Sequence, residues 1–165
     1  INLVRTSAFP TDAVLGVAED GSIRDKSRPP KTEPVPGIIM YRFDAPLHFG
    51  NANYFNQRVM QLLDESEDVR WFLWDAETIS YLDSTAAAML LSLIKEMRER
   101  KVTFCVSRLK GPIRSTINRT KRLYRAFQSI PHYPSMGKAL KAFEDETAHI
   151  ERATKLVKKS RMLKS

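Results

Sequence analysis

The segment between residues 69 and 94 constrains the fold of this chain more than any other. It contains the apolar run 71–74, which Asp75 closes, then a short polar and aromatic loop, and then an Ala-, Met- and Leu-rich run behind Asp83 and Ser84. An apolar strand without polar alternation is typical of a strand covered on both faces, and a helix directly behind it indicates an α/β crossover. The segment therefore predicts a buried strand, a loop and a helix, and the loop is a candidate site.

The neighbouring sequence alternates strands with helices. Residues 38–43 form an apolar run that predicts a strand, and the short apolar piece 47–49 predicts a second one. From Asn51 onward, apolar residues recur at three- and four-residue spacing, which predicts a helix of about four turns with the Asn51 side chain as its N-cap acceptor. Residues 102–107 form another apolar run after a tight connection, so a parallel crossover is expected.

The last third of the chain predicts two more helices and a weak strand. Pro112 suits a first helical position and begins a third helical segment that extends to about residue 127. A weak strand near Ser129 and Ile130 and a final helix capped by Ser135 follow. The final helix has one apolar stripe, made of Met136, Leu140, Phe143, Ile150 and Val157. The expected fold is α/β, with a four- to five-stranded mixed sheet and about four flanking helices.

Charge is distributed unevenly along the chain. Residues 1–100 carry 11 Lys/Arg against 15 Asp/Glu, whereas residues 101–143 carry 10 against none, within a net charge of +8. Pro and Gly interrupt residues 1–36, which predicts an irregular linker, and residues 37–147 predict one compact domain. Residues 148–165 predict a basic helical extension that frays or projects. No apolar run approaches the roughly 18 residues that span a bilayer.

Asp83 and Ser84 stand where the chain leaves the sheet and enters a helix. Unpaired N–H groups and the helix dipole favour an anion at such a position, so a phosphate on Ser84 or Thr85, or a bound anion, would be stabilised there. Simple N-capping by Asp83 or Ser84 explains the same residues and is the alternative. The candidate anion or partner site comprises Asp83, Ser84, Thr85 and Ala86.

Catalytic and metal-binding patterns are weak in this sequence. Asp75, Glu77 and Asp83 could form an acid and base cluster, but no histidine lies near them in the pattern. The histidines, which are His48, His132 and His149, lack metal-ligand spacing, and no phosphate-binding or dinucleotide glycine motif is present. We predict no enzyme, no metal site and no cofactor. The single cysteine, Cys105, falls in an apolar run and is expected to be buried.

The second half of the chain predicts a basic surface. Its residues are Arg108, Lys110, Arg114, Arg119, Lys121, Arg122 and Arg125. Such a surface attracts phosphates, anionic lipid headgroups or acidic protein partners, and a solvated face explains it equally well. Tyr124 could stack on bases, yet no nucleic-acid-binding motif is present, so a nucleic-acid partner is not expected.

Three stretches of the sequence are similar to one known family. Residues 36–52, which read PGIIMYRFDAPLHFGNA, and residues 110–114, KGPIR, resemble the STAS domain of SulP (sulfate permease-type) anion transporters. Residues 8–16, AFPTDAVLG, resemble the connector that follows the last membrane helix of such transporters, which places the linker 1–36 behind that helix. The resemblance covers roughly residues 8–143.

The resemblance implies a STAS fold with a regulatory or assembly function in a secondary transporter of sulfate, bicarbonate or a related anion. The domain would lie at the cytoplasmic face of the cell membrane. Its implied partners are the membrane domain of the same transporter and a second copy, through a homodimer of the parent protein. An acidic protein or anionic lipid would meet the basic surface.

Bacterial anti-sigma factor antagonists share the STAS domain and provide the alternative interpretation. In that branch, the serine directly behind the loop aspartate is phosphorylated, and Ser84 has this position behind Asp83. The antagonist pattern has glycine where this chain has Ala86, and a free antagonist would start near Gly37, so the transporter domain is favoured. Binding of a nucleotide or another phosphorylated ligand near Asp83 to Ala86 is a further hypothesis.

Overall fold

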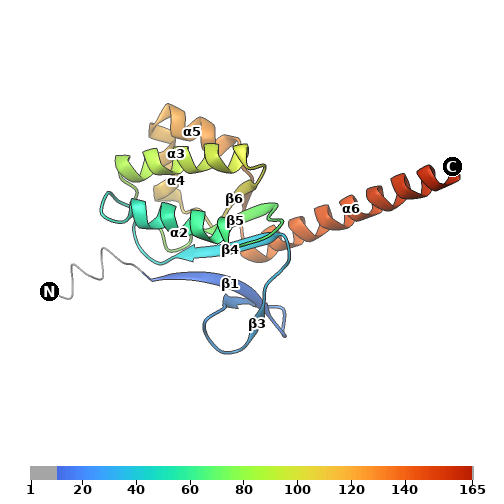
Figure 1. Cartoon of the computed structure of the whole chain (residues 1–165). Coiled ribbons are helices and arrows are strands. Elements are labelled where there is room, and N and C mark those ends of the chain that lie inside the picture. Colours follow the sequence, from blue (N-terminus) through green and yellow to red (C-terminus); the bar gives the residue numbers. More distant parts are fainter. Residues whose placement is uncertain (1–10, 165) are drawn as a thin grey trace.

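The computed structural model describes residues 11–164, which form helices around one mixed sheet (Figure 1). The elements are β1 (Asp12–Ala18), β2 (Ile23–Asp25), β3 (Thr32–Glu33), β4 (Ile38–Phe43), α2 (Ala52–Asp64), β5 (Trp71–Asp75), α3 (Ser84–Glu99), β6 (Thr103–Ser107), α4 (Gly111–Arg119), α5 (Lys121–Gln128), β7 (His132–Tyr133) and α6 (Met136–Leu163). The strand order is β2-β1-β4-β5-β6-β7, with β3 also paired to β1. Strands β4 to β7 are parallel, and β1 is antiparallel to β4.

The predicted fold class is confirmed, and the element counts are higher than expected. The described residues contain seven strands and five helices, in place of four to five strands and about four helices. All five residues of β5 are buried, because β4 and β6 flank this strand and helices cover the sheet. Burial on both faces explains why its sequence shows no polar alternation.

The prediction of an irregular linker over residues 1–36 is wrong for the residues that the structure describes. Strand β1 pairs with β4 from Asp12 opposite Phe43 to Leu15 opposite Met40, and further along it pairs with β2 and β3. The partners β2 and β3 are only three and two residues long, too short to show a hydrophobic period. Residues 1–10, including the first part of the connector-like stretch, lie outside the described residues.

Two apolar layers enclose the sheet. On one face, α2 to α5 pack against β4, β5 and β6, and the buried helix residues include Phe55 and Val59 of α2 and Leu90 and Leu93 of α3. The predicted apolar faces of both helices are therefore confirmed. On the other face, the first turns of α6 pack against the strands, and the Phe143 ring makes an edge-to-face contact with Trp71. Cys105 is buried in this second layer, as predicted.

Three local predictions differ from the structure. Residues 47–49 do not form a strand, since only Leu47 makes an isolated bridge, to Leu82. The third helical segment divides at Thr120, whose extended backbone separates α4 from α5. The weak strand lies at His132–Tyr133 instead of 129–130, where it pairs with the end of β6. The first and third differences depend on pairing between distant segments, which local sequence does not encode, whereas the second is a local break in the backbone.

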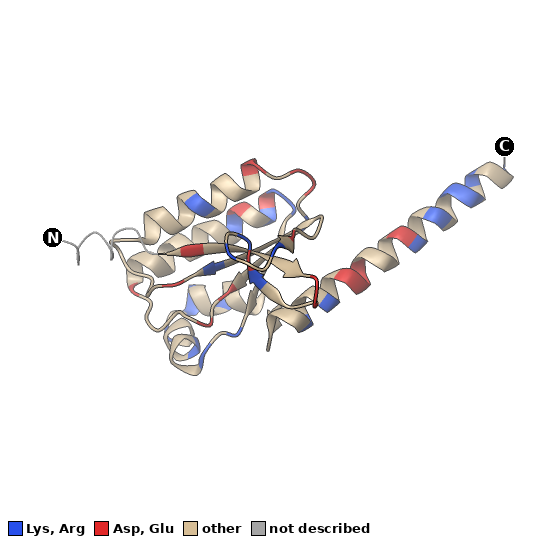
Figure 2. Cartoon of the chain, turned by 90° about the horizontal axis from the view of Figure 1, so that it is seen from below, with Lys and Arg blue, Asp and Glu red and all other residues tan. Residues whose placement is uncertain are grey.

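Helix α6 is packed only along its first half. The Ser135 hydroxyl accepts a hydrogen bond from the Lys138 N–H at 3.2 Å, which confirms the predicted cap. The predicted apolar stripe is buried up to Phe143, but Ile150 and Val157 are exposed, because the helix continues beyond the sheet (Figure 1). Beyond Glu151, every charged position of this projecting part is Lys or Arg (Figure 2).

Candidate functional site

The candidate site lies at the edge of the sheet where the parallel strands β4, β5 and β6 have their carboxyl ends. Three loops meet there, which connect β4 to α2 (44–51), β5 to α3 (76–83) and β6 to α4 (108–110). Ligands of parallel α/β sheets bind at this edge, because the loops and the helix N-termini converge on it. The loop singled out in the sequence is therefore part of a larger surface.

Asp83 joins two of these loops through one carboxylate. Its Oδ1 accepts a hydrogen bond from the Ala86 N–H at 2.8 Å, which confirms the predicted N-cap of α3. Its Oδ2 accepts a second hydrogen bond from the Phe49 N–H at 2.8 Å, across 34 residues of sequence. Backbone hydrogen bonds around Leu47 and Leu82 add to the same junction. The carboxylate thus fixes the β4–α2 loop against the start of α3.

Asn51 contributes to this junction in a different way from the one predicted. It stands at the N-cap position of α2, but its side chain makes no capping hydrogen bond there. Its Oδ1 accepts from the His48 N–H at 3.0 Å, and its Nδ2 donates to the Pro46 carbonyl at 2.8 Å. The side chain is buried, so it braces the β4–α2 loop instead of the helix start.

The outer surface of this junction combines aromatic and hydroxyl side chains. Phe49 is 78% exposed and Tyr81 is 56% exposed, which is unusual for side chains of this size. Ser84 and Thr85, the candidate phospho-acceptors, are exposed in the first turn of α3, whereas Ala86 is fully buried. The four predicted site residues therefore separate into an exposed pair, a capping carboxylate and a core methyl group.

Of the three carboxylates considered as an acid and base cluster, two share one arginine and the third lies in the separate capping junction. Asp75 is fully buried at the end of β5 and pairs with Arg108, whose Nε donates to Asp75 Oδ1 at 3.1 Å. The same guanidinium contacts Glu77 at 2.6 Å, and Asp83 belongs to the separate capping junction. The hydrogen bond to Asp75 raises the pKa of Arg108 above its already high value. The pairing gives Asp75 a structural function, because a buried charge requires a partner.

The seven predicted basic residues lie in two groups in the structure. Arg108, Lys110 and Arg114 line a cavity of about 410 Å³ with His132, between β6, β7 and the start of α4. Arg119, Lys121, Arg122 and Arg125 are exposed at the end of α4 and along α5. The first group lies near the carboxyl edge of the sheet, and the second group extends the positive surface outward.

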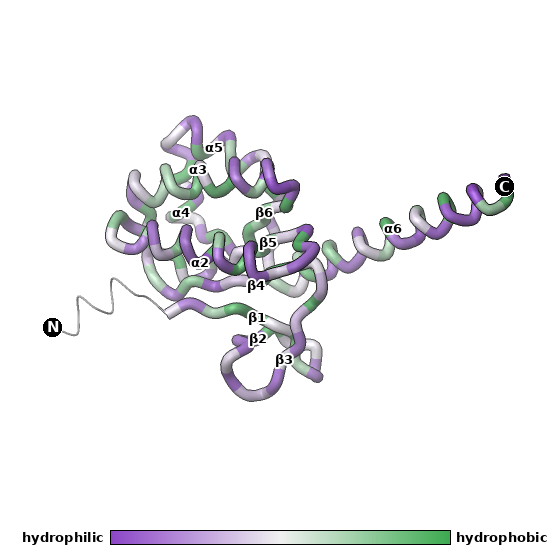
Figure 3. Tube along the Cα trace, in the orientation of Figure 1, coloured by the Kyte–Doolittle hydropathy of each residue, from purple (hydrophilic) through white to green (hydrophobic). Residues whose placement is uncertain are grey.

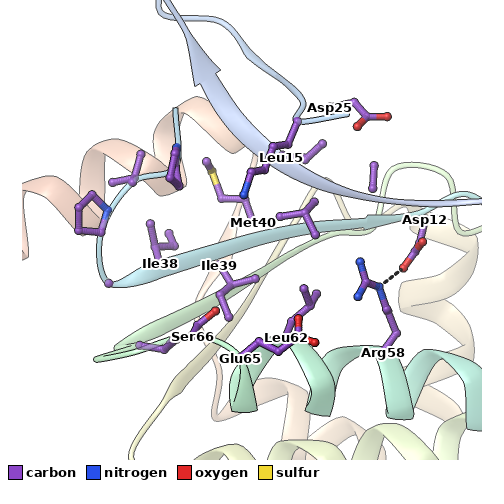
Figure 4. A pocket seen from close by; sticks show the side chains of 18 of the residues that line it. Asp12, Leu15, Asp25, Ile38, Ile39, Met40, Arg58, Leu62, Glu65 and Ser66 are labelled. Atoms are coloured by element: carbon purple, nitrogen blue, oxygen red, sulfur yellow. Dashed lines mark hydrogen bonds and ion pairs between the residues drawn. The ribbon is translucent and has the colours of Figure 1, made fainter. Parts of the chain in front are cut away.

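A groove beside β4 was not predicted from the sequence. Strands β1 and β4 pair only from Asp12 to Leu15, and beyond that point β1 turns to β3, which leaves a groove of about 770 Å³ (Figure 4). Its floor is apolar and its rim includes Glu65 and Glu67. At one end, Arg58 Nε donates to Asp12 Oδ2 at 3.0 Å. Only the separation of the strands creates this groove, so no sequence motif marks it.

Metal-ligating side chains do not gather in the described part of the chain. Within residues 11–164, no group of three His, Cys, Asp or Glu side chains could hold a metal ion. Burial raises the pKa of the Cys105 thiol to about 12, which keeps it protonated and unreactive. Likewise, no helix in this range is both long and apolar enough to cross a membrane.

Comparisons with known proteins agree with this geometry. The family model for the STAS domain matches residues 29–139. A probable sulfate transporter of Mycobacterium tuberculosis is 35% identical over 119 residues, which cover 71% of this chain and 21% of that transporter. The chain thus spans about a fifth of the length of this relative.

Two solved structures share the fold at low identity. The murine Slc26a9 anion transporter matches with a TM-score of 0.75 and 14% identity, over 87% of this chain and 24% of that one. A putative anti-sigma factor antagonist from Thermotoga maritima matches with a TM-score of 0.57 and 13% identity, over 67% of this chain and 90% of that one. Because the family model covers most of the described residues, the chain belongs to the STAS domain family.

Proposed function

We propose that this chain is the regulatory or assembly domain of a SulP-type anion transporter, located at the cytoplasmic face of the cell membrane. Two findings support this proposal. One relative is a probable sulfate transporter, and the match covers only 21% of its length, as expected if the chain corresponds to one domain of a larger transporter. The domain acts by contact with the membrane domain of its parent protein, which assembles as a homodimer. The chemistry of the described residues is that of a binding surface, since the buried charges are paired and the thiol is protonated.

The observation that carries this proposal is the surface fixed by Asp83. Two aromatic side chains, Phe49 and Tyr81, are exposed on loops that the Asp83 junction holds rigid. Exposed aromatic residues on a rigid support are typical of hot spots in protein interfaces, because they bury a large area at a small entropic cost. We therefore assign the carboxyl edge of the sheet as the contact surface for the membrane domain.

The test replaces Phe49 and Tyr81 by alanine in the parent transporter. The double variant is expected to reach the membrane in reduced amount or to transport at a rate at least tenfold lower, since one hot-spot side chain contributes about 2 kcal/mol. The control is Met162→Ala, which removes an exposed apolar side chain from α6, away from these loops. Equal abundance and transport for the double variant and the control would refute the assignment.

The basic residues of α4 and α5 support a second contact of the same domain. Arg114, Arg119 and Arg122 are exposed on α4 and α5, where anionic headgroups or an acidic segment of the transporter can reach them. Neutralising the three arginines with glutamine is expected to lower transport, whereas neutralising the exposed Lys26, Lys31 and Lys95 is not. Unchanged transport in the arginine variant would exclude this contact.

A phosphorylated switch is the second candidate function, favoured by one observation. Ser84 is exposed in the first turn of α3, where a phosphate would meet the positive end of the helix. Intact-mass measurement after purification from cells is expected to show one phosphate that Ser84→Ala removes and Thr85→Ala retains. The same helix start would accept a nucleotide phosphate. NMR titration with nucleotide that leaves the amides of Asp83 to Ala86 unshifted would contradict this binding mode.

A further inference from the structure

The distal half of α6 is a helix without a surface to pack on. From His149 to Lys164, every described residue is exposed, and the segment projects from the body (Figure 1). Helices of this length are marginal in water unless an apolar face is buried. The segment nevertheless carries large apolar side chains, which are Ile150, Leu156, Val157, Met162 and Leu163, with exposed fractions of 44% to 79%. A partner that covers an apolar face is therefore expected.

The apolar residues of the segment gather on one side of the helix. At about 100° per residue, Ile150, Ala153, Leu156, Val157 and Leu163 fall within a sector of about 140°. Ser160 shares this sector, and His149 and Lys164 lie at its two ends along the helix axis. Met162 lies outside this sector. Hydrophilic and hydrophobic positions alternate along the projecting helix (Figure 3). The segment is thus an amphipathic helix, in which the apolar sector is the unpartnered face.

Basic side chains border this sector on both sides. The same helical geometry places Arg152 and Lys159 at about 90° to 110° from the centre of the sector on one side, and Arg161 at about 90° on the other. The acidic residue of the segment, Glu151, lies opposite the sector. Cations that flank an apolar face are typical of helices that lie in a membrane interface, where they reach phosphate headgroups while the apolar face enters the acyl region.

Two protein surfaces of the same chain fit this helix less well. A second copy of residues 149–164, side by side with the first, would bring six Lys and Arg side chains against six more, which is repulsive. Glu65 and Glu67 border the apolar groove beside β4 and would attract the cations of a second copy. That groove, of about 770 Å³, is too small for a helix about 24 Å long and about 10 Å wide, so much of the apolar sector would remain in water. An anionic bilayer offers headgroup phosphates to the cations and an acyl region to the apolar sector.

We propose that residues 149–164 form an interfacial helix that binds the surface of an anionic lipid bilayer. Leu156 and Val157 enter the boundary of the acyl region, and Arg152, Lys159 and Arg161 contact headgroup phosphates. The body of the domain, which includes the first half of α6, is thereby held beside the membrane. This inference does not depend on which anion the parent protein transports or on the contact surface at the carboxyl edge.

Vesicle sedimentation with the 165-residue chain tests the proposal. The chain is expected to sediment with vesicles of equimolar phosphatidylcholine and phosphatidylglycerol and to remain in solution with phosphatidylcholine alone. The variant L156Q/V157Q is expected to lower the partition coefficient at least tenfold, because it removes apolar area from the sector. The matched control, Met162→Gln, changes an exposed apolar residue outside the sector and is expected to bind as the unmodified chain does.

Charge variants test the orientation of the helix. Neutralising Arg152 and Lys159 removes two flanking cations and is expected to weaken binding about fivefold for each, whereas neutralising Lys155 and Lys158, on the opposite side, has a smaller effect. Equal binding of L156Q/V157Q and Met162→Gln, or absence of vesicle binding, overturns the proposal. The proposal is also overturned if light scattering shows a dimer that both L156Q/V157Q and E65Q/E67Q abolish. The helix would then bind the acidic groove rim of a second copy.

Discussion

Replacing Asp83 by alanine is expected to loosen the candidate site and to destabilise the domain by about 2 to 3 kcal/mol. The loss of the cap on the Ala86 N–H accounts for about 1 kcal/mol. The hydrogen bond to the Phe49 N–H adds a similar or larger amount, because its acceptor is ionised and Asp83 is half-buried. Asp83→Asn retains one carbonyl acceptor in place of two carboxylate oxygens, so an intermediate loss is expected.

Urea unfolding monitored by tryptophan fluorescence measures the loss, and amide exchange locates it. The control is Ser135→Ala, which removes a cap with a single hydrogen bond, to the Lys138 N–H, and is expected to cost about 1 kcal/mol. The Phe49 amide is expected to exchange faster in Asp83→Ala and to be unaffected in Ser135→Ala. If Asp83→Ala costs no more than Ser135→Ala, or if exchange at Phe49 is unchanged, Asp83 does not join the two loops.

Three further changes are expected to have measurable effects on stability. Burial raises the pKa of the Cys105 thiol from its ordinary 9.0 to about 12, so the thiol ionises in the unfolded chain before it does in the folded one. In urea unfolding, the contribution of this thiol to the free energy of unfolding should be constant below pH 9 and should fall above it by up to about 1.4 kcal/mol per pH unit. Cys105→Ala should remove the loss between about pH 9 and 10. Arg108→Gln leaves the buried Asp75 without its ion pair and should lower the free energy of unfolding by about 3 kcal/mol, as measured by urea unfolding. Adding Asp75→Asn to this variant should restore most of the loss. A chain that ends at residue 149 should unfold within about 0.5 kcal/mol of the full chain, because residues 150–164 are exposed, and a larger loss would show that they pack on the body.

The central part of the fold follows from the sequence, because its elements are long and periodic. The runs around Trp71 to Asp75 and residues 102–107, with the helix from Ser84 between them, are each visible within a short window. Local sequence does not reveal strand β1, in which buried Ala13 and Leu15 alternate with partly exposed residues, because Pro and Gly interrupt the surrounding segment. Its stability comes from pairing with β4, and a partner far along the chain is invisible to local patterns.

The candidate site was predictable in its position but not in its construction. A polar pair before an apolar helix marks a helix start, so Asp83 was identified as a cap from its neighbours alone. Its second hydrogen bond, to the Phe49 N–H, depends on how two loops meet at the sheet edge. Similarly, the sequence shows Arg108 and Asp75 as charges, and only the parallel register of β5 and β6 brings them together. Tertiary pairing therefore decides which charged residues remain available to a partner.

The antiparallel position of β1 determines how the domain bears a mechanical load. Residue 11 lies next to the carboxyl end of β4, since Asp12 is opposite Phe43, and Asp12 is also tied to α2 through Arg58. The hydrogen bonds between β1 and β4 are perpendicular to the strands, so a pull along β1 loads several of them at once. Tension applied along β1 at residue 11 is thus resisted in shear and transmitted through β4 to the sheet.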